Sequence, residues 1–413
     1  MAAPGVPHDR PRMDATGDAA RDPARFMTPT GRDAARQTAN GNHNPGPPPP
    51  FVTLVAPGEL AEADLAAWRR FQRQDIALAS PFLGPDFTRI AAEVRRGVEV
   101  AVMRRDGAAI AFLPFERRGR IGGPVAGAMS DCQAILAEPR LDLDVRALVR
   151  EAGLSVHDFT FARTAQSPFL PFHRATCTSH LIDLSAGFDA YLRERREAGR
   201  LLPGGSSGLP HHAVQRARRL ERQAGPLRFT LHDPDPGTLR QLIAWKRQQY
   251  RRTGAPDVFA RRWTVELLER IHATQSAAFA GVLSTLSIGQ RVIAAHMGMR
   301  SDDVLHWWFP SFDIAFARHS PGIILLVELC RAAAERGIRI IELGPGEEGY
   351  KLLMANAGVT MAAGHIVARP SLSASWRCLR HGMEDIAARM PIGRYASWPA
   401  KLFQRFETAM RLR

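Results

Sequence analysis

Lysine, cysteine and long apolar stretches are scarce in this 413-residue chain. Arginine supplies 52 of the 55 positive residues, and lysine supplies only three. The four cysteines show no CxxC or Cys/His spacing, which argues against a zinc site and against a disulfide framework. No stretch reaches the ~20 apolar residues of a membrane helix, and no apolar segment of a secretory signal follows the first basic residues. We therefore expect a reduced, cytoplasmic protein that holds no metal.

The positive charge is concentrated in two segments. The formal net charge is +14, a value that raises the question of a nucleic-acid partner. Eight arginines stand against four acidic residues in 189–222, and nine basic residues stand against three acidic ones in 369–413. Because the excess lies in polar segments with helical spacing, we interpret it as solvated helix surface and expect no DNA partner.

Composition divides the chain into five parts. Residues 1–50 are rich in Pro, Gly, Asp and Arg and end in a run of four prolines. Such a segment buries too little apolar area to offset its ordering entropy, so we predict a disordered tail. The other predicted parts are a degenerate first domain over 51–185, a basic connector over 186–224, a second domain over 225–368 and a basic helical tail over 369–413.

The two predicted domains share one order of elements: strand, two helices, a meander of strands, helix and strand. Apolar periodicity places strands of the first domain at 51–55, 98–103, 109–115, 157–162 and 180–184, and helices at 59–73, 86–95 and 141–151. In the second domain it places strands at 227–231, 280–288, 291–300, 304–309, 338–343 and 360–368, and helices at 238–251, 261–273, 321–336 and 350–356. The pattern predicts an α/β (α+β) fold in which each domain has a mixed, mostly antiparallel sheet flanked by helices.

A helix start with room for a phosphate follows the strand at 304–309. Ser320 suits the N-cap, Pro321 suits the first helical position and Gly322 leaves space for a ligand. The unpaired backbone N–H groups and the partial positive charge of a helix N-terminus favour a phosphate or pyrophosphate. An ordinary well-capped helix would have the same residues.

Four motifs in the second half resemble one family. They are WWFPSFD at 307–313, FARHSPG at 316–322, GPGEEGYK at 344–351, and the first-helix segment with Lys246, Gln249, Tyr250, Thr253, Gly254 and Asp257–Phe259. In this order they resemble the CelD/BcsL-type acetyltransferases, which are associated with bacterial cellulose and other polysaccharide synthesis. The resemblance covers about residues 225–368 well and residues 51–185 more faintly. The Gly/Ser segment at 203–208 departs from the family, which continues there as a basic helix.

The resemblance implies a tandem GNAT-like fold related to the Fem peptidyltransferases. The expected reaction is transfer of an acyl group from acetyl-CoA or another acyl-CoA to an amine or hydroxyl, in exopolysaccharide or cell-envelope synthesis. Residues expected at the cofactor are Trp308, Phe309, Ser320, Pro321, Gly322 and Ile323. Two alternatives remain open: a Fem-type aminoacyl transferase that uses charged tRNA, and a non-catalytic partner of a polysaccharide synthase.

Five residues are candidates for the chemistry: His296, Asp313, Tyr350, Lys351 and Lys246. Acyl transfer needs a base for the acceptor, a stabilised oxyanion and a proton for the leaving thiolate. His296 and Asp313 are candidate bases, although a buried histidine and a turn-capping aspartate would also explain them. Tyr350 is a candidate acid for the thiolate, or an aromatic residue packed on the sheet. Glu342 either is a site carboxylate or faces solvent.

The two lysines enter the list because composition favours arginine so strongly. A buried lysine can have a lowered pKa and act as a base, or place a compact charge on an oxyanion, where arginine cannot.

Residues 373–390 have apolar residues three to four apart. This spacing indicates an amphipathic helix that either packs on its own domain or contacts a membrane surface or a polysaccharide synthase.

Overall fold

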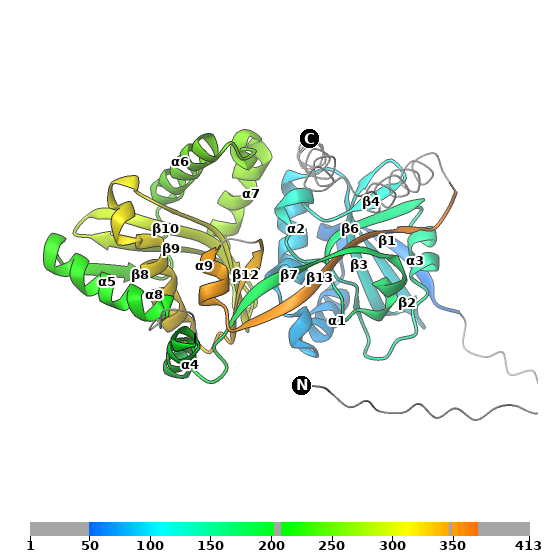
Figure 1. The fold of residues 1–413 in the computed structure, drawn as a ribbon. Helices are drawn as coiled ribbons and strands as arrows, with labels where there is room; N and C mark the ends of the chain where they lie inside the picture. Colours follow the sequence, from blue (N-terminus) through cyan, green and yellow to red (C-terminus); the bar gives the residue numbers. More distant parts are fainter. Residues whose placement is uncertain (1–48, 202–207, 347–348, 371–413) are drawn as a thin grey trace, which may run out of the picture. The chain divides into compact units, whose positions relative to one another are not determined.

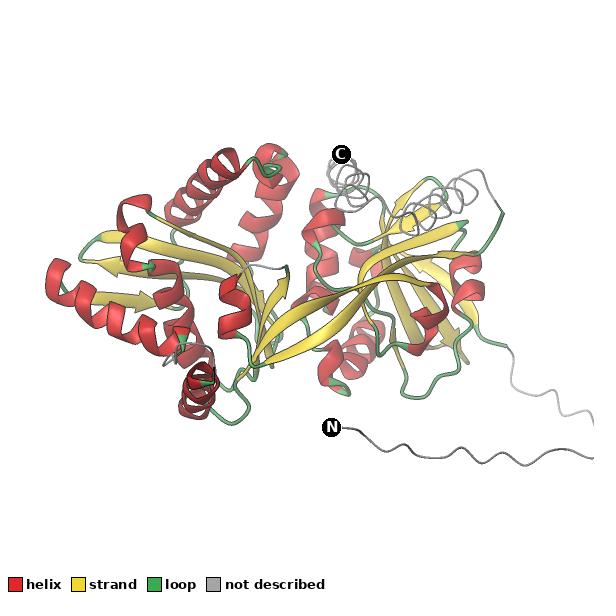
Figure 2. Ribbon diagram, viewed as in Figure 1, coloured by secondary structure: helices red, strands yellow, loops and turns green. Residues whose placement is uncertain are grey.

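A computed structural model describes residues 49–201, 208–346 and 349–370. The predicted N-terminal tail lies almost wholly outside these ranges, and the amphipathic helix at 373–390 lies entirely outside them. The described part forms one large sheet with helices on both faces (Figures 1 and 2). None of its helices combines the length and the low polarity that crossing a membrane requires.

The first half of the fold extends from β1 to β7. Its strands are β1 Phe51–Val55, β2 Val98–Arg105, β3 Ala108–Arg118, β4 Ile121–Gly123, β5 Leu136–Ala137, β6 Val156–Arg163 and β7 His173–Asp183. Its α-helices are α1 Glu62–Arg73, α2 Pro85–Val94 and α3 Val145–Glu151. The short η1 Pro57–Glu59, η2 Ile76–Leu78, η3 Pro81–Leu83, η4 Gly127–Met129 and η5 Ser167–Phe172 are 3-10 turns.

Two basic helices, α4 Phe188–Arg200 and α5 Leu209–Ala224, lead into the second half. Its strands are β8 Leu227–Thr230, β9 Ala280–Ile288, β10 Arg291–Arg300, β11 Val304–Phe312, β12 Ile340–Pro345 and β13 Ala357–Val367. Its helices are α6 Pro236–Thr253, α7 Arg262–Ala273, α8 Pro321–Glu335 and α9 Gly349–Met354, with the 3-10 turns η6 Val258–Ala260 and η7 Ile314–His319.

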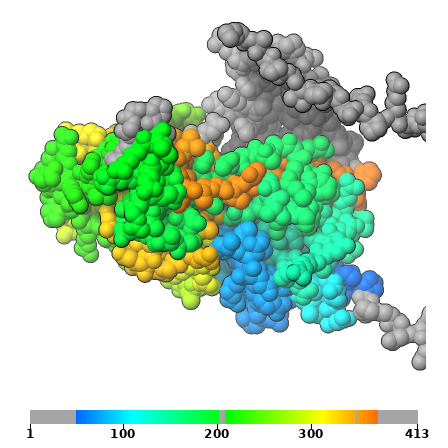
Figure 3. Space-filling model, turned by 60° about the horizontal axis from the view of Figure 1, so that its bottom comes forward, coloured from blue at the N-terminus to red at the C-terminus, as the bar shows by residue number. Residues whose placement is uncertain are grey.

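The two halves exchange a strand. The order of the sheet is β1-β2-β3-β4-β6-β13-β7-β12-β11-β10-β9-β8, with β5 paired to β3. β13, from the end of the described chain, therefore lies between two strands of the first half, and β7 lies between two strands of the second. Figure 3 shows β13 crossing the visible face from one half onto the other. A single hydrogen-bonded sheet thus joins both halves.

Apolar packing also joins the halves. One core cluster contains Trp68 of α1 and Phe87 of α2 together with Leu267 of α7 and Phe309 of β11. A second cluster lies under α4, α5 and α8, and a third lies under α3. Burial of apolar surface at about 25 cal/mol per Å² is the main favourable term in such a core. The shared cluster therefore opposes separation of the halves.

Several elements have the predicted bounds, and others differ for physical reasons. β9 and β10 occupy the predicted residues, and α8 begins at the predicted Pro321. β7 begins at His173, earlier than the predicted residue 180, because its exposed residues pair with β13, about 180 positions away in sequence. β4 was not predicted because three residues show no periodicity.

Candidate active site

β11 and β12 run in parallel for three residue pairs and then separate. The pairs are Val304 with Ile340, Leu305 with Ile341 and His306 with Glu342. Beyond Glu342, β12 continues along β7, while β11 continues along β10 to Phe312. Beyond these three pairs no strand pairing joins β11 to β12, and we call this break in the pairing the opening. Unpaired strand edges can accept the amide groups of an extended ligand.

The helix that follows β11 begins beside this opening. Pro321 is the first residue of α8, as predicted, but Ser320 adopts a left-handed conformation and its side chain does not cap the helix. Instead, Ser320 Oγ accepts a hydrogen bond from Arg216 of α5, at 2.8 Å. At Gly322, an added Cβ would only touch the Phe312 ring, at 3.6 Å. The helix end thus combines an N-terminal dipole, a nearby guanidinium and free space.

A bulge in β11 contains Trp308, one of the two aromatic residues expected at the cofactor, and Phe309, the other, follows directly. The register of β10 and β11 shifts between Met297 and Met299, opposite Trp307 and Trp308. Gly298 is required there because an added Cβ would lie 2.1 Å from the carbonyl oxygen of His306. Trp308 is half-buried and its ring meets Phe82 edge-on, with the ring centroids 5.3 Å apart.

His296 holds this bulge in place. The backbone N–H of Trp308 donates to His296 Nε2 at 3.2 Å, and His296 Nδ1 lies 3.1 Å from Ser284 Oγ. Because Nε2 accepts, the proton of the neutral ring is on Nδ1 and is donated to Ser284. Burial lowers the pKa of His296 to about 3. With both nitrogens engaged and the side chain fully buried, the geometry favours a positioning role over that of a base.

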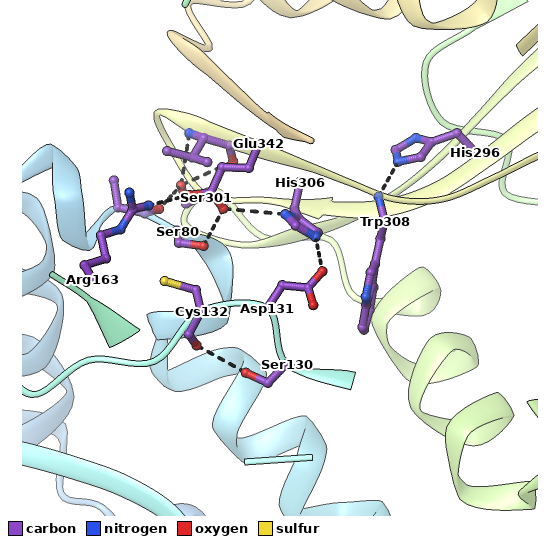
Figure 4. A network of polar contacts seen from close by, with 12 residues as sticks. Ser80, Ser130, Asp131, Cys132, Arg163, His296, Ser301, His306, Trp308 and Glu342 are labelled. Carbon is purple, nitrogen blue, oxygen red and sulfur yellow. Dashed lines mark hydrogen bonds and ion pairs between the residues drawn. The ribbon is translucent and has the colours of Figure 1, made fainter. Parts of the chain in front are cut away.

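A polar cluster lies at the point where β11 and β12 separate (Figure 4). Glu342 Oε1 accepts from Arg163 of β6, and Glu342 Oε2 accepts from Ser80 Oγ at 2.7 Å. On the other side, His306 Nε2 lies 3.1 Å from Asp131 Oδ2. His306 Nδ1 is 3.5 Å from Glu342 Oε2, which is an ion-pair contact. The cluster thus joins residues of both halves.

The cluster keeps its members charged despite burial. Burial acts to raise the pKa of Glu342, but Arg163 and His306 outweigh it and lower the pKa to about 2. Burial acts to lower the pKa of His306, but the hydrogen bond to Asp131 and the ion-pair contact with Glu342 outweigh it and raise the pKa. Cys132 has its thiol pKa raised to about 12, chiefly by burial. Its thiol therefore stays protonated and unreactive near neutral pH.

Two of the predicted catalytic residues lie toward the far end of β11. Asp313 caps the turn η7 through Ala315 N and pairs with Arg291 at 2.6 Å. The hydrogen bonds from Ala315 and Arg291 outweigh burial and lower its pKa. Lys246 Nζ donates to the carbonyl oxygen of Pro310 at 3.1 Å and lies over the Tyr250 ring. These contacts fit a turn cap and a helix-to-strand tether, and their catalytic roles stay predictions.

The predicted catalytic residues Tyr350 and Lys351 lie on α9, after β12. Lys351 is buried, and its Nζ donates to the carbonyl oxygen of Pro345 at 2.8 Å. It thereby fixes the end of β12 to α9. Tyr350 is half-buried and packs against the second core cluster. Ile323, the remaining residue expected at the cofactor, is half-buried on the first turn of α8.

Sequence reasoning did not identify His306, Asp131 or Arg163. His306 had a signal, because it interrupts the apolar run of β11 directly before the two tryptophans. Glu342 similarly interrupts an apolar strand, and its burial shows that it does not face solvent. Asp131 had no signal, because it lies 175 positions from His306 in sequence and meets it only through the fold.

Comparisons with known proteins agree with this geometry. Residues 211–352, about a third of the chain, match the family described as "Acetyltransferase (GNAT) domain". The matched range contains α8, β11 and β12, the elements that form the opening. No curated protein matches the chain.

Solved structures are similar to this chain at low sequence identity. FemX is 8% identical and has a TM-score of 0.53, over 77% of this chain and 98% of that chain. A tandem GNAT protein from the clavulanic acid biosynthesis pathway is 9% identical, with a TM-score of 0.44 over 78% of this chain and 100% of that chain. The C-terminal domain of a putative lysylphosphatidylglycerol synthetase from Agrobacterium fabrum is 14% identical, with a TM-score of 0.45 over 76% and 95%.

The predicted fold class is confirmed in the described residues: a mixed, mostly antiparallel sheet flanked by helices, with the same order of strands in both halves. The narrower resemblance to the CelD/BcsL-type family stays a prediction, as do the domain boundaries. Over residues 211–352 the chain is thus similar to a GNAT acetyltransferase domain.

Proposed function

We propose that the chain transfers an acyl group from acyl-CoA to an amine or hydroxyl acceptor at the opening between β11 and β12. The observation that carries the proposal is the end of strand pairing at His306 and Glu342, while both strands continue. The amides of a pantetheine arm would pair with the free strand edges. The thioester would then lie where the strands separate.

The start of α8 would hold the pyrophosphate. Its first-turn N–H groups and dipole favour an anion, and Gly322 leaves the helix end open. Arg216, on the exposed face of α5, donates to Ser320 and adds a positive charge at the same end. Trp308 and Phe309 lie on β11, the strand that forms one side of the opening.

The chemical identity of the substrates is the finer part of the proposal. Acetyl-CoA is the proposed donor, and a component of exopolysaccharide or the cell envelope is the proposed acceptor, because the motifs of the second half resemble the polysaccharide-associated acetyltransferases. Acyl-CoA is made inside cells, so we place the reaction in the cytoplasm. Contact of residues 369–413 with a membrane or a synthase belongs to the same proposal.

A second candidate is aminoacyl transfer from charged tRNA. FemX shares the fold over nearly its whole length, and α5 exposes Arg216, Arg218, Arg219 and Arg222. An exposed basic helix suits a phosphate backbone. We favour acyl-CoA because residues 211–352 match a GNAT acetyltransferase model.

Calorimetric titration of the full chain tests the cofactor site. We expect acetyl-CoA to bind and Gly322→Val to weaken binding at least tenfold, about 1.4 kcal/mol, because the side chain fills the helix end. Gly58→Val is the matched control: an added Cβ there meets nothing within 4 Å, so affinity should not change. Equal affinities of the wild type and Gly322→Val would place the cofactor elsewhere, and binding of charged tRNA but not of acetyl-CoA would favour the second candidate.

A further inference from the structure

Four charged side chains form a row from the core of the first half to the opening in the second. Arg163 contacts Glu342, Glu342 contacts His306, and His306 contacts Asp131. Arg163 and Asp131 belong to the first half, and the two residues between them belong to β11 and β12. Figure 4 shows the row, with Ser80 beside Glu342. Neither half alone contains the complete set.

Burial changes along the row. The side chains of Arg163 and Glu342 are each 6% exposed and that of His306 is 2% exposed, whereas that of Asp131 is 25% exposed. Buried charges are costly unless each is paired and hydrogen-bonded. The three inner groups therefore support one another, and Asp131 is the member that solvent or a substrate can reach.

Asp131 lies beside the site proposed for the thioester. Gly344 is two residues past Glu342 on β12 and has a left-handed φ of +75°. An added Cβ at Gly344 would lie 3.3 Å from Asp131 Oδ2 and 3.6 Å from His306 Cε1. The carboxylate thus faces the backbone of β12 just after the point where β11 and β12 separate.

The loop that carries Asp131 is held rigidly on both sides. Ser130 Oγ donates to the carbonyl oxygen of Cys132 at 3.2 Å. Gln133 Oε1 accepts from the backbone N–H groups of Thr160 and Phe161 in β6, at 2.8 and 2.9 Å. A carboxylate fixed in this way needs little reorganisation to act on a substrate.

We propose that Asp131, supplied by the first half, is the proton acceptor for the nucleophile, with His306 and Glu342 as positioning residues. The inference rests on the proposed acyl transfer. The amine or hydroxyl attacks the thioester carbonyl, a C–N or C–O bond forms, and the C–S bond breaks. The proton leaves the nucleophile for Asp131 Oδ and passes to the departing thiolate, so that acyl-SCoA and HX give acyl-X and CoASH.

The surrounding charges suit this role. His306 is faced by Asp131 from the loop, by Glu342 from β12 and, through Glu342, by Arg163 from β6; neutral His296 lies on β10. The raised pKa of His306 favours an imidazolium between two carboxylates. The contact with His306 Nε2 holds Asp131 Oδ2 in place and leaves the other carboxylate oxygen for the acceptor.

Asp131→Asn is the direct test, with Asp86→Asn as its matched control. Asp86 is also a first-half aspartate, 21% exposed and paired with one cation, Arg69. The assay follows loss of acetyl-CoA thioester absorbance with ethanolamine, which offers an amine and a hydroxyl, and with water alone. We expect Asp131→Asn to lower kcat at least ~100-fold, as for loss of a general base, with unchanged acetyl-CoA affinity and circular dichroism.

The outcomes separate the inference from the proposed function. A tenfold or smaller loss of kcat in Asp131→Asn overturns the inference and leaves the proposed function standing. The inference is also overturned if the wild type binds acetyl-CoA but accelerates thioester loss neither with ethanolamine nor with water alone. Failure of the wild type to bind acetyl-CoA overturns the proposed function itself. His306→Gln should change the shape of the pH profile of kcat, whereas a purely structural histidine would leave that shape intact.

Discussion

The two halves of the sheet contain the same strand order but differ at the point where their parallel strands separate. In the second half, β11 continues for six residues past its last pair, His306–Glu342, and a fifteen-residue helix begins with Pro321 and Gly322. In the first half, β4 ends one residue after its last pair, Gly122–His157, and α3 has only seven residues. The second half is open where the first is closed.

Side chains fill the corresponding place in the first half. An added Cβ at Gly122 would lie 2.6 Å from Leu154 Cδ1 and 2.9 Å from His157 Nδ1. The N-terminus of α3 already holds a carboxylate, because Asp144 accepts from Ala147 N. A pyrophosphate would therefore meet a like charge there. The same order of strands thus gives an unpaired stretch of strand edge in the second half and a filled one in the first.

Arg163→Met should have the largest effect on stability. The substitution leaves Glu342 buried without its guanidinium partner, and breaking such a pair costs about 3–5 kcal/mol. Urea denaturation should show this loss, whereas Asp86→Asn, at a partly exposed pair, should cost less than about 1 kcal/mol. Equal losses in the two variants would show that the Arg163–Glu342 pair does not stabilise the fold more than an exposed pair does.

Acid should weaken both halves, through the buried His157 on β6 and His296 on β10, whereas His306 has the opposite pH dependence. Burial lowers the pKa of His157 to about 4 and that of His296 to about 3. The unfolded chain takes up these protons below its ordinary pKa of about 6.5, so stability falls as pH drops from there toward the folded values. His306 has a raised pKa, so its contribution is present below about pH 6.5 and is lost as pH rises through the folded pKa.

Substitutions at His157 and at His306 test these opposite pH dependences of stability. Melting temperatures of His157→Gln and His306→Gln, measured at pH 5 and pH 8, should differ in direction. His157→Gln should lessen the fall on acidification, by about 1.4 kcal/mol per unit of pKa shift at most, and His306→Gln should lessen the fall at high pH. If both substitutions changed the pH dependence of the melting temperature in the same direction, the assignment of a neutral His157 and a charged His306 would be wrong.

Lys351→Arg should lower turnover about tenfold, or ~1.4 kcal/mol, while keeping the fold. Lys351 is buried and donates to the carbonyl oxygen of Pro345, and a planar guanidinium is larger than the ammonium and has a different donor geometry. Steady-state kinetics with circular dichroism as the folding control would measure this. Full activity would reduce Lys351 to a generic positive charge.

Asp144→Asn should have the smallest effect. Asparagine is also a good N-cap, so the helix remains, while the carboxylate at the start of α3 is removed. Acetyl-CoA affinity should stay within about twofold, because β4 is too short to hold a cofactor. Tighter binding or a second binding event would show that charge alone keeps the first half from binding cofactor.

Local patterns predicted the elements, and the fold determined the site. The helix start at Pro321 and the strands at 280–288 and 291–300 follow from periodicity and from the preference of proline for the first helical position, which act within a few residues, although Ser320 does not cap the helix as predicted. β7 was predicted too short because half of it is exposed and its partner β13 is distant in sequence. Asp131 and Arg163 could not be predicted, because only the pairing of β6 and β7 with β13 and β12 brings them to His306 and Glu342.

Hydrogen–deuterium exchange of the full chain with and without acetyl-CoA tests most directly where the cofactor binds. The opening between β11 and β12 predicts slower exchange at residues 307–312 and 321–326 when acetyl-CoA is present, because bound ligand covers strand and helix-terminal amides. Residues 121–123 and 145–151 of the first half should exchange at unchanged rates. Protection confined to the first half, or no protection in either segment of the second, would contradict the account.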